Sequence, residues 1–241
     1  MSGVARFERK YLLSLDQYYR LRNRIVPFVA RDQHSLAAGG AYLVRSIYYD
    51  TRDYRAWYEK EDGDFGRIKL RIRAYTDRWE QCDTVSVEIK TRRGNGMVKY
   101  ATRVDSAEYE EFLKSGHWPS AEDNATLAEF ERLQRTRQLV PVCLVQYHRE
   151  GFAARDGSPV RVTMDHDVES TRALWLFPDS PILNPHRPRR PIFEVKTQAG
   201  EPDWLTAIIR EHALKLAANS KYWQGIEIIR PNMVTPREVA P

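Results

Sequence analysis

Apolar and polar positions alternate with a period of two along much of the chain, which is typical of strands that have two different faces. The tetrapeptide Arg93-Gly94-Asn95-Gly96 lies between two such segments and has the residues of a tight hairpin turn. Strands should therefore dominate the structure. The pattern predicts them at residues 7–13, 42–50, 67–75, 84–91, 97–104, 142–152, 160–168 and 192–197.

Helical segments interrupt these strands. Ser14 with Gln17, and Asp105 with Glu108, have the spacing of a capping box, so a helix should begin at each pair. We expect the second of these helices to stop at Gly116. Further helices are expected from Thr51 or Asp53 through Tyr58, from Asn124 to Leu139, and from Pro202 through Leu216. From Ile226 onward the pattern predicts a loose tail.

The fold class follows from this order of elements. The chain has 241 residues, of which 42% are hydrophobic and 29% are charged, enough for one sizeable core and a polar exterior. Strands joined by hairpins and by helical connections predict a single α+β domain. The apolar strand faces would pack against helices on the outside, and the charged faces would point together, as they would across a closed antiparallel barrel.

Charge is concentrated on particular strand faces. In Arg67-Ile68-Lys69-Leu70-Arg71-Ile72-Arg73 every odd position is cationic and every even position is aliphatic. For one strand alone, a solvated outer face explains this equally well. The other strands favour a shared polar face, because charged or polar residues again share a side: Glu8 with Lys10, Glu88 with Lys90, Lys99 with Arg103, Tyr147 with Arg149, and Glu194 with Lys196.

A shared face rich in lysine and arginine predicts a polyanionic ligand, because such a face repels itself unless negative charge is bound to it. Phosphate suits it, since arginine offers planar paired donors and lysine a compact charge. A carboxylate such as Glu194 or Glu8 is the hard oxygen ligand that Mg²⁺ or Mn²⁺ accepts.

Composition excludes several other chemistries. The two cysteines, Cys82 and Cys143, form no C-x-x-C pair, and the six histidines include no H-E-x-x-H, so zinc hydrolysis is excluded. The sequence has no run of eighteen apolar residues, and its first ten residues carry charges, so we expect no membrane span and a cytoplasmic location. The net charge of +5 and the pI near 9.2 are compatible with an anionic binding partner.

Several motifs together resemble the catalytic domain of the vacuolar transporter chaperone (VTC) family, the polyphosphate polymerase branch of the CYTH-like triphosphate tunnel metalloenzymes. The likeness covers residues 5–230, with 231–241 as a loose tail. The family fold that it implies is a tunnel-shaped antiparallel β-barrel with helices outside. The motifs are Phe7-Glu8-Arg9-Lys10-Tyr11, Ser46-Ile47-Tyr48-Tyr49-Asp50, Lys69-Leu70-Arg71-Ile72-Arg73, Val87-Glu88-Ile89-Lys90, Val98-Lys99, Gln146-Tyr147-His148-Arg149, Phe193-Glu194-Val195-Lys196 and Ser220-Lys221-Tyr222.

This resemblance implies a role for each matching residue. Tunnel cations would hold the triphosphate of ATP and the growing polyphosphate, and Tyr147 would contact a phosphate. Lys69 shares the cationic face and is expected to bind substrate, with the barrel rim as the alternative position. We expect Arg71, Arg73, Lys90 and Arg149 to act in catalysis. The residues expected to bind substrate are Lys10, Lys69, Lys99, Tyr147 and Lys221.

For the metal ion, Mn²⁺ or Mg²⁺, the resemblance implies Glu194 as a ligand and Glu8 as a second one. The alternative role for Glu194 is a salt bridge to a neighbouring lysine or arginine. Arg6 stands where the opening E-x-E-x-K motif of the superfamily has its first glutamate, so only Glu8 and Lys10 of that motif remain.

The implied reaction transfers the γ-phosphoryl group of ATP to inorganic polyphosphate. Two alternatives stay open: a triphosphatase that uses the same tunnel, and a non-catalytic module that binds polyphosphate or nucleic acid. Cations that alternate with aliphatic residues in strands argue against specific nucleic-acid binding, which favours an outer basic face with stacking aromatics. The expected partners are therefore ATP and inorganic polyphosphate or triphosphate, and the sequence leaves protein partners open.

Overall fold

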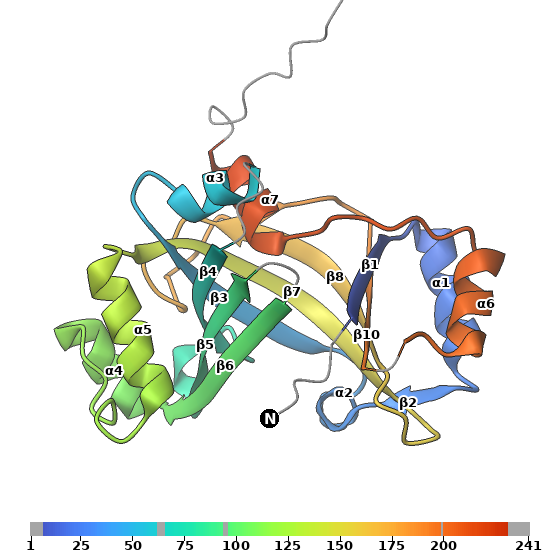
Figure 1. Ribbon diagram of the computed structural model, residues 1–241, viewed down its shortest axis with the longest axis horizontal. Helices are drawn as coiled ribbons and strands as arrows, with labels where there is room; N and C mark the ends of the chain where they lie inside the picture. Colours follow the sequence, from blue (N-terminus) through green and yellow to red (C-terminus); the bar gives the residue numbers. More distant parts are fainter. Residues whose placement is uncertain (1–6, 62–65, 94–95, 199, 231–241) are drawn as a thin grey trace, which may run out of the picture. The chain divides into compact units, whose positions relative to one another are not determined.

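The computed structural model describes residues 7–61, 66–93, 96–198 and 200–230 (Figure 1). The strands are β1 (Phe7–Leu12), β2 (Val29–Arg31), β3 (Tyr42–Asp50), β4 (Gly66–Ala74), β5 (Thr84–Arg93), β6 (Gly96–Asp105), β7 (Val140–Ala154), β8 (Arg161–Thr171), β9 (Asn184–Pro185) and β10 (Ile192–Thr197). The helices are α1 (Leu15–Ile25), α2 (Gln33–Ala37), α3 (Arg55–Glu61), α4 (Ser106–Ser115), α5 (Ala125–Thr136), α6 (Asp203–Glu211) and α7 (Lys221–Ile229), with a short 3-10 helix, η1 (Trp79–Gln81).

The expected α+β class with an antiparallel sheet is confirmed. The strands follow the order β1-β10-β8-β7-β3-β4-β5-β6, with β2 paired to β7 and β9 paired to β8. This path of hydrogen-bonded strands does not close on itself within the described residues. Arg93 pairs with Gly96, so β5 and β6 form the predicted hairpin, whose two tip residues, 94 and 95, lie outside the described residues. The predicted tail, 231–241, also lies outside them.

The chain divides into two compact units. Unit 1 comprises the described residues of 1–43, 147–168 and 187–220, and unit 2 those of 44–146, 169–186 and 221–241. Strands β7 and β8 contribute residues to both units. The expectation of a single domain over 5–230 stays a prediction.

Unit 1 has its own hydrophobic core beneath helices α1 and α6, which lie side by side (Figure 1). The α1 residues Leu21 and Ile25 and the α6 residue Leu205 are fully buried in it. Helix α1 begins as predicted, since Ser14 Oγ accepts from the Gln17 amide at 3.1 Å and Gln17 Oε1 accepts from the Ser14 amide at 2.9 Å. The sequence therefore anchors this helix over the apolar face of the unit.

Unit 2 has a second core, in which helices α4 and α5 cover the apolar face of β5 and β6. Asp105 caps α4 by accepting from the Glu108 amide at 2.7 Å, and Gly116 ends the helix in the left-handed region. Glu108 does not complete the predicted capping box, because its carboxylate accepts from the Ser120 amide at 2.9 Å instead. Asn124 caps α5 as predicted.

Two helices end earlier than the sequence predicts. Helix α5 ends at Thr136, so Leu139 lies beyond it, and helix α6 ends at Glu211, before Leu216. In both cases a residue with positive φ follows closely, Gln138 at 52° and Ala213 at 48°. Neither residue is a glycine or an asparagine, so the usual sign of a helix end is missing from the sequence.

The prediction of a loose tail from Ile226 was wrong. Ile226 belongs to helix α7 and is fully buried, and Gly225 beside it is buried as well. A Cβ atom at Gly225 would lie 2.7 Å from Ser170 Oγ and 2.9 Å from Cys143 Sγ. Glycine therefore lets α7 pack directly on β7 and β8 within unit 2.

Candidate functional site: two polar faces with opposite charge balance

Strand register brings the predicted cations of unit 2 onto one face. Arg71 pairs with Glu88 and with Tyr48, and Arg73 pairs with Ser86 and Ser46. Neighbouring residues of a strand point to opposite sides of a sheet, so Leu70 and Ile72 enter the core while the arginines face away from it. We call this side the cationic face. It includes Tyr48, Lys69, Arg71, Arg73, Glu88, Lys90 and Lys99.

The buried carboxylate of Glu88 organises the cationic face. Arg71 approaches it with Nε at 2.8 Å and a terminal nitrogen at 2.5 Å, Lys99 Nζ lies at 3.1 Å, and an Arg73 nitrogen lies at 3.6 Å. Arg71 also donates to the Tyr48 hydroxyl at 3.0 Å, and Arg73 donates to Ser46 Oγ at 3.2 Å. These contacts fix the two guanidinium groups in place before any ligand binds.

The neighbouring cations determine the direction of the pKa shift of Glu88. Burial by itself would raise the pKa of Glu88, but the charges of Arg71, Arg73 and Lys99 outweigh burial and hold its pKa well below the usual range. Burial and the two arginines lower the pKa of Lys99, and Glu88 only partly offsets them. The carboxylate of Glu88 is therefore shared among three cations.

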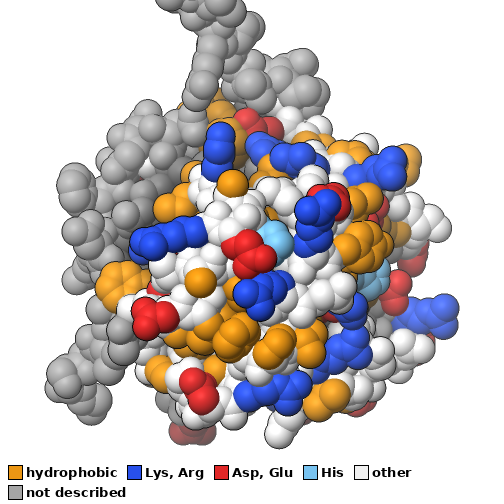
Figure 2. Space-filling view, turned by 90° about the vertical axis from the view of Figure 1, so that its right-hand side faces the viewer, with side chains coloured by type: hydrophobic (Ala, Val, Ile, Leu, Met, Phe, Trp, Pro, Cys, Tyr) orange, Lys and Arg blue, Asp and Glu red, His pale blue; other side chains and the backbone are white. Residues whose placement is uncertain are grey.

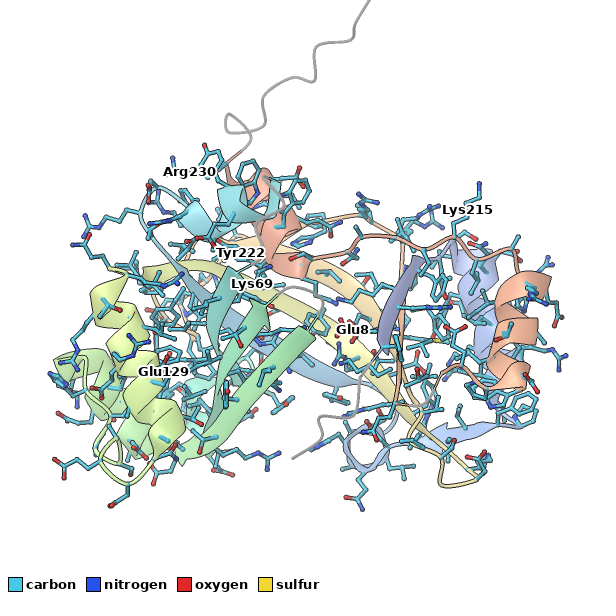
Figure 3. The ribbon with its side chains drawn as sticks, viewed as in Figure 1. Glu8, Lys69, Glu129, Lys215, Tyr222 and Arg230 are labelled. Atoms are coloured by element: carbon cyan, nitrogen blue, oxygen red, sulfur yellow. The ribbon has the colours of Figure 1, made fainter. Side chains whose placement is uncertain are left out.

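A row of lysines crosses the same face. Lys69 on β4 pairs with Lys90 on β5, and Lys90 pairs with Lys99 on β6. Like charges directly opposite one another destabilise a sheet by mutual repulsion. Lys69 Nζ also lies 5.4 Å from the centre of the Tyr222 ring, which faces it from α7 (Figure 3). The register thus places three lysines side by side across β4, β5 and β6.

Helix α7 brings Lys221 and Tyr222 to this region. The Tyr222 ring lies 5.2 Å from the Tyr48 ring, and its hydroxyl donates to the buried carboxylate of Asp50. The charge of Lys221 helps to lower the pKa of Tyr48, against the effect of burial. Tyr222 therefore anchors the helix that supplies the predicted Lys221.

Unit 1 has a polar face of a different kind. Lys10 on β1 pairs with Glu194 on β10, and Glu8 pairs with Lys196. Lys10 Nζ lies 2.8 Å from Glu8 and 3.7 Å from Glu194, and Lys196 Nζ lies 2.7 Å from the other oxygen of Glu194. Burial alone would lower the pKa of Lys10, but Glu194 and Glu8 raise it well above its ordinary value.

Arg149 and Tyr147 complete the unit 1 group. Asp165, which is fully buried, accepts two hydrogen bonds from Arg149, at 2.6 and 2.8 Å. The guanidinium carbon of Arg149 lies 5.2 Å from the centre of the buried Tyr147 ring. We call the residues Glu8, Lys10, Tyr147, Arg149, Asp165, Glu194 and Lys196 the balanced face, since cations and carboxylates alternate on it.

The balanced face has the donors that a hard divalent cation prefers. Glu8 and Glu194 both approach the Lys10 ammonium, so two carboxylates are directed toward one positive charge. No group of three or more His, Cys, Asp or Glu side chains able to hold a metal occurs among the residues that the structure describes. A Mg²⁺ or Mn²⁺ ion held by one or two carboxylates takes its remaining ligands from phosphate oxygens and water. Glu8 and Glu194 fit such an ion.

The outer surface near α1 and α6 differs from both polar faces. Figure 2 shows lysines and arginines there scattered among carboxylates and apolar side chains, not gathered into one basic patch. Several belong to exposed ion pairs, such as Arg24 with Glu211 at 3.0 Å and Arg20 with Asp16 at 3.0 Å. Exposed pairs of this kind contribute little to stability or to recognition.

The predicted site residues therefore fall into two groups. The cationic face of unit 2 contains Lys69, Arg71, Arg73, Lys90 and Lys99, with Lys221 on the nearby α7, and the balanced face of unit 1 contains Glu8, Lys10, Tyr147, Arg149 and Glu194. Arg6 lies outside the described residues.

The sequence analysis gave no role to Glu88, Asp165 or Tyr222, which hold the predicted cations in position. Glu88 shares the strand parity of Lys90, but its contact with Arg71 depends on the register between β4 and β5. Asp165 lies on the opposite strand face from the apolar Val162 and Met164, so the alternation in the sequence could have placed it on the polar face.

The chain is similar to solved structures. A protein from Bacillus halodurans described as a proposed adenylate cyclase matches with a TM-score of 0.54 and 16% identity, over 88% of this chain and 92% of its own. A protein from Pyrococcus horikoshii gives a TM-score of 0.49 at 16% identity, over 92% of this chain and 99% of its own. At these identities the likeness concerns the fold alone, and no curated protein sequence matches the chain.

No helix among the described residues is both long enough and apolar enough to cross a membrane. The model of the VTC domain family matches residues 5–230, nearly the whole chain and every strand and helix described above. The resemblance to this family drawn from the motifs is therefore confirmed: the protein belongs to the VTC domain family.

Proposed function

We propose that this protein is an ATP-dependent polyphosphate polymerase, which transfers the γ-phosphoryl group of ATP to the end of an inorganic polyphosphate chain. The observation that carries the proposal is the row of Lys69, Lys90 and Lys99 across β4, β5 and β6, beside Arg71 and Arg73. A bound chain of phosphoryl groups would relieve the repulsion along this row. Membership of the VTC domain family supports the same substrate class.

Each cation has a distinct part in the proposal. Arg71 and Arg73 present planar donors whose orientation is held by Glu88, Tyr48 and Ser46, so they would grip phosphoryl oxygens with little loss of entropy. The lysines would follow the charge along the chain as flexible point charges. Lys10, Arg149 and Tyr147 in unit 1, and Lys221 on α7, would bind further phosphates.

Glu8 and Glu194 would hold the divalent ion, Mn²⁺ or Mg²⁺, through their carboxylate oxygens. Such an ion supplies neutralisation of phosphate charge when it is bound. Lys10 would then remain close to both carboxylates.

The reaction itself needs no nucleophile from the protein. A terminal oxygen of the polyphosphate attacks the γ-phosphorus of ATP, a new P–O bond forms, and the bond from the γ-phosphorus to the β–γ bridging oxygen breaks to release ADP. Alignment of the two phosphate groups and neutralisation of their charge supply most of the rate enhancement in such transfers. The arginines and lysines of the cationic face would provide these effects. The proposal includes a cytoplasmic location, where ATP is at hand.

The test is to incubate the purified protein with ATP and Mn²⁺, with and without a short polyphosphate primer. Products are resolved on a polyphosphate gel, and ADP and free phosphate are measured in parallel. A ladder of polymer with matching ADP supports the polymerase. Free phosphate without polymer would replace it with a triphosphatase, and binding of polyphosphate without turnover would leave a binding module.

A further inference from the structure

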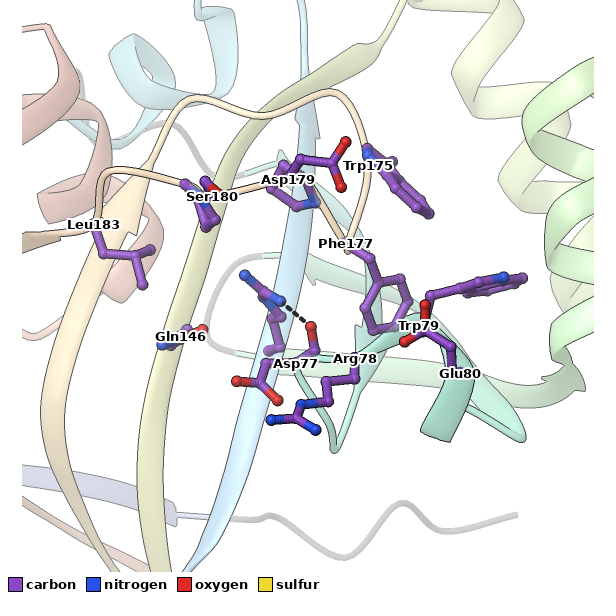
Figure 4. A pocket seen from close by; sticks show the side chains of 13 residues that line it. Asp77, Arg78, Trp79, Glu80, Gln146, Trp175, Phe177, Asp179, Ser180 and Leu183 are labelled. Atoms are coloured by element: carbon purple, nitrogen blue, oxygen red, sulfur yellow. Dashed lines mark hydrogen bonds between the residues drawn. The ribbon is translucent and has the colours of Figure 1, made fainter.

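A cavity of about 500 Å³ lies in unit 2, between the start of β3, the segment around η1, strand β7 and the loop that follows β8 (Figure 4). This volume falls within the usual range of small-molecule sites. Aromatic and charged side chains line it together. Those that matter most are Arg45, Trp79, Gln146, Trp175 and Phe177.

The cavity opens on the side of the sheet away from the cationic face. Arg45 pairs with Ala74 on β4, whereas the next residue, Ser46, pairs with Arg73. Because consecutive residues of a strand point to opposite sides, Arg45 and Arg73 lie on different faces. The cavity is therefore separate from the proposed phosphate site, and the inference goes beyond the proposed function.

Two buried polar atoms beside this cavity have no hydrogen-bond partner within the part of the chain that the structure describes. Arg45 is only 3% exposed, and one terminal nitrogen donates to the Asp77 carbonyl oxygen at 2.8 Å, the dashed line in Figure 4. Within the described residues, Arg45 Nε has no hydrogen-bond partner, and neither does Gln146 Oε1. A buried donor and a buried acceptor without partners are costly, so a ligand that reaches them with complementary groups would relieve this cost.

The charges around the cavity disfavour an anionic ligand. Three carboxylates line it, from Asp77, Glu80 and Asp179, against the guanidinium groups of Arg45 and Arg78. The aromatic side chains contact one another edge to face or tilted, with Trp79 and Phe177 centres 5.6 Å apart and Trp175 and Phe177 centres 5.7 Å apart. This surface suits a neutral, planar ring that presents acceptors to Arg45 and donors to Gln146 or a carboxylate.

We propose that this cavity binds the guanine base of a nucleoside. Guanine places two adjacent acceptors, O6 and N7, on one edge, which is the pattern that an arginine guanidinium recognises. Its N1–H and N2–H₂ groups are donors, and they would meet Gln146 Oε1 or a lining carboxylate. Adenine has an amino donor beside N7, which would oppose the guanidinium of Arg45. The ribose would extend toward solvent.

Isothermal titration of the full chain with guanosine, adenosine and cytidine tests this proposal. We expect saturable guanosine binding that is at least tenfold tighter than adenosine binding. Arg45→Met should weaken guanosine binding at least tenfold, and Gln146→Leu at least threefold. Lys114→Met, which removes an exposed cation at 64% side-chain exposure, serves as the control and should leave the affinity unchanged.

Absence of saturable guanosine binding would overturn the proposal, as would equal affinities for guanosine and adenosine. If benzoate binds in place of the nucleosides, the cavity is a carboxylate site instead. If Arg45→Met does not fold, the proposal is tested with Gln146→Leu and Trp175→Ala. Unchanged guanosine affinity in both variants would refute the guanine-binding proposal. Guanosine carries no phosphate, so Lys90→Ala should leave its binding intact even if the polymerase proposal fails.

Discussion

The polar faces of the two units differ in charge balance. On the cationic face of unit 2, lysines and arginines outnumber the carboxylates, and Arg71, Arg73 and Lys99 share the single carboxylate of Glu88. On the balanced face of unit 1, Lys10, Lys196 and Arg149 each contact a carboxylate. Both faces are built on antiparallel strands with apolar residues behind them. The difference supports the two parts of the proposal, a polyanion on the face of unit 2 and a divalent ion beside the carboxylates of unit 1.

The largest effect is expected when one lysine is removed from the row on the cationic face. Lys90→Ala should lower polymer synthesis by about 10²–10³-fold, the usual effect of losing one transition-state donor. Its free energy of unfolding should stay the same or rise, because repulsion from Lys69 and Lys99 is relieved. The rate of polymer synthesis and the free energy of unfolding in urea are measured for the parent protein and for Lys90→Ala.

Lys114→Ala is the matched control for Lys90→Ala, because Lys114 is exposed and pairs only with Glu110 on its own helix among the ion pairs of the described residues. Both its activity and its stability should be close to those of the parent. Normal activity in Lys90→Ala would remove the lysine row from the proposed site.

A second test separates the two faces by their need for metal. Glu194→Gln should raise the Mn²⁺ concentration required for half-maximal activity by about 10-fold to 100-fold, since one charged ligand is lost. Affinity for inorganic tripolyphosphate without metal should stay within about twofold of the parent value. Glu211→Gln changes an exposed carboxylate and should do neither. An unaltered Mn²⁺ requirement would assign Glu194 to a salt bridge with Lys10 and Lys196.

A third test concerns a structural carboxylate in unit 1. Glu150 accepts hydrogen bonds from Tyr18 at 2.5 Å and Arg22 at 2.8 Å, and it contacts His166 at 2.9 Å. Burial would raise the pKa of Glu150, but His166, Tyr18 and Arg22 lower it to about 2. A lowered folded-state pKa gives stability that is complete above the unfolded value of about 4.3 and is lost as pH falls toward 2.

Glu150→Gln should therefore flatten the loss of stability between about pH 5 and pH 2, by on the order of 3 kcal/mol. Chemical unfolding at several pH values, followed by tryptophan fluorescence, measures the difference between the two proteins. An identical pH profile for both proteins would show that the three contacts do not stabilise the charged form of Glu150.

The smallest effect is expected at the attachment of α7. Gly225→Ala would place a methyl group against Ser170 and Cys143, so it should lower the free energy of unfolding by about 1–3 kcal/mol. Activity should fall with it, since the same helix supplies Lys221 and holds Tyr222 over Lys69. Gly157→Ala is not a suitable control because Gly157 has a positive φ. A stable, fully active Gly225→Ala protein would show that the packing of α7 does not affect the proposed site.

Much of the fold could be predicted from local pattern, because alternation and caps act over a few residues. The strands from 42–50 and 192–197 match β3 and β10, and the capping box at Ser14 starts α1. Leu139 and Leu216 were wrongly assigned to helices, because the left-handed conformations of Gln138 and Ala213 end these helices earlier. Glutamine and alanine rarely adopt this conformation, so their identity does not predict a helix end. Helix α7 was missed because burial against other strands stabilises it.

The site could be predicted only in part. Strand parity found the charges of Arg71, Arg73 and Glu194, and motif resemblance added roles for Lys10 and Lys221. The central position of Glu88 follows from the register of three strands, which short-range patterns do not determine. The cavity around Arg45 depends on a loop that comes back to β3 from more than a hundred residues later, so no short-range pattern indicates it.

The most direct test of the central claim is the affinity of inorganic tripolyphosphate for the protein, measured by titration calorimetry at two salt concentrations. The triple variant Lys69→Ala, Lys90→Ala, Lys99→Ala is compared with the equally charged control Arg20→Ala, Lys114→Ala, Lys215→Ala, whose changes lie on exposed residues. We predict that the lysine-row variant loses at least 100-fold in affinity and most of the salt dependence, while the control stays within about threefold of the parent. Equal affinity of the two variants would contradict the assignment of the cationic face as the polyphosphate site.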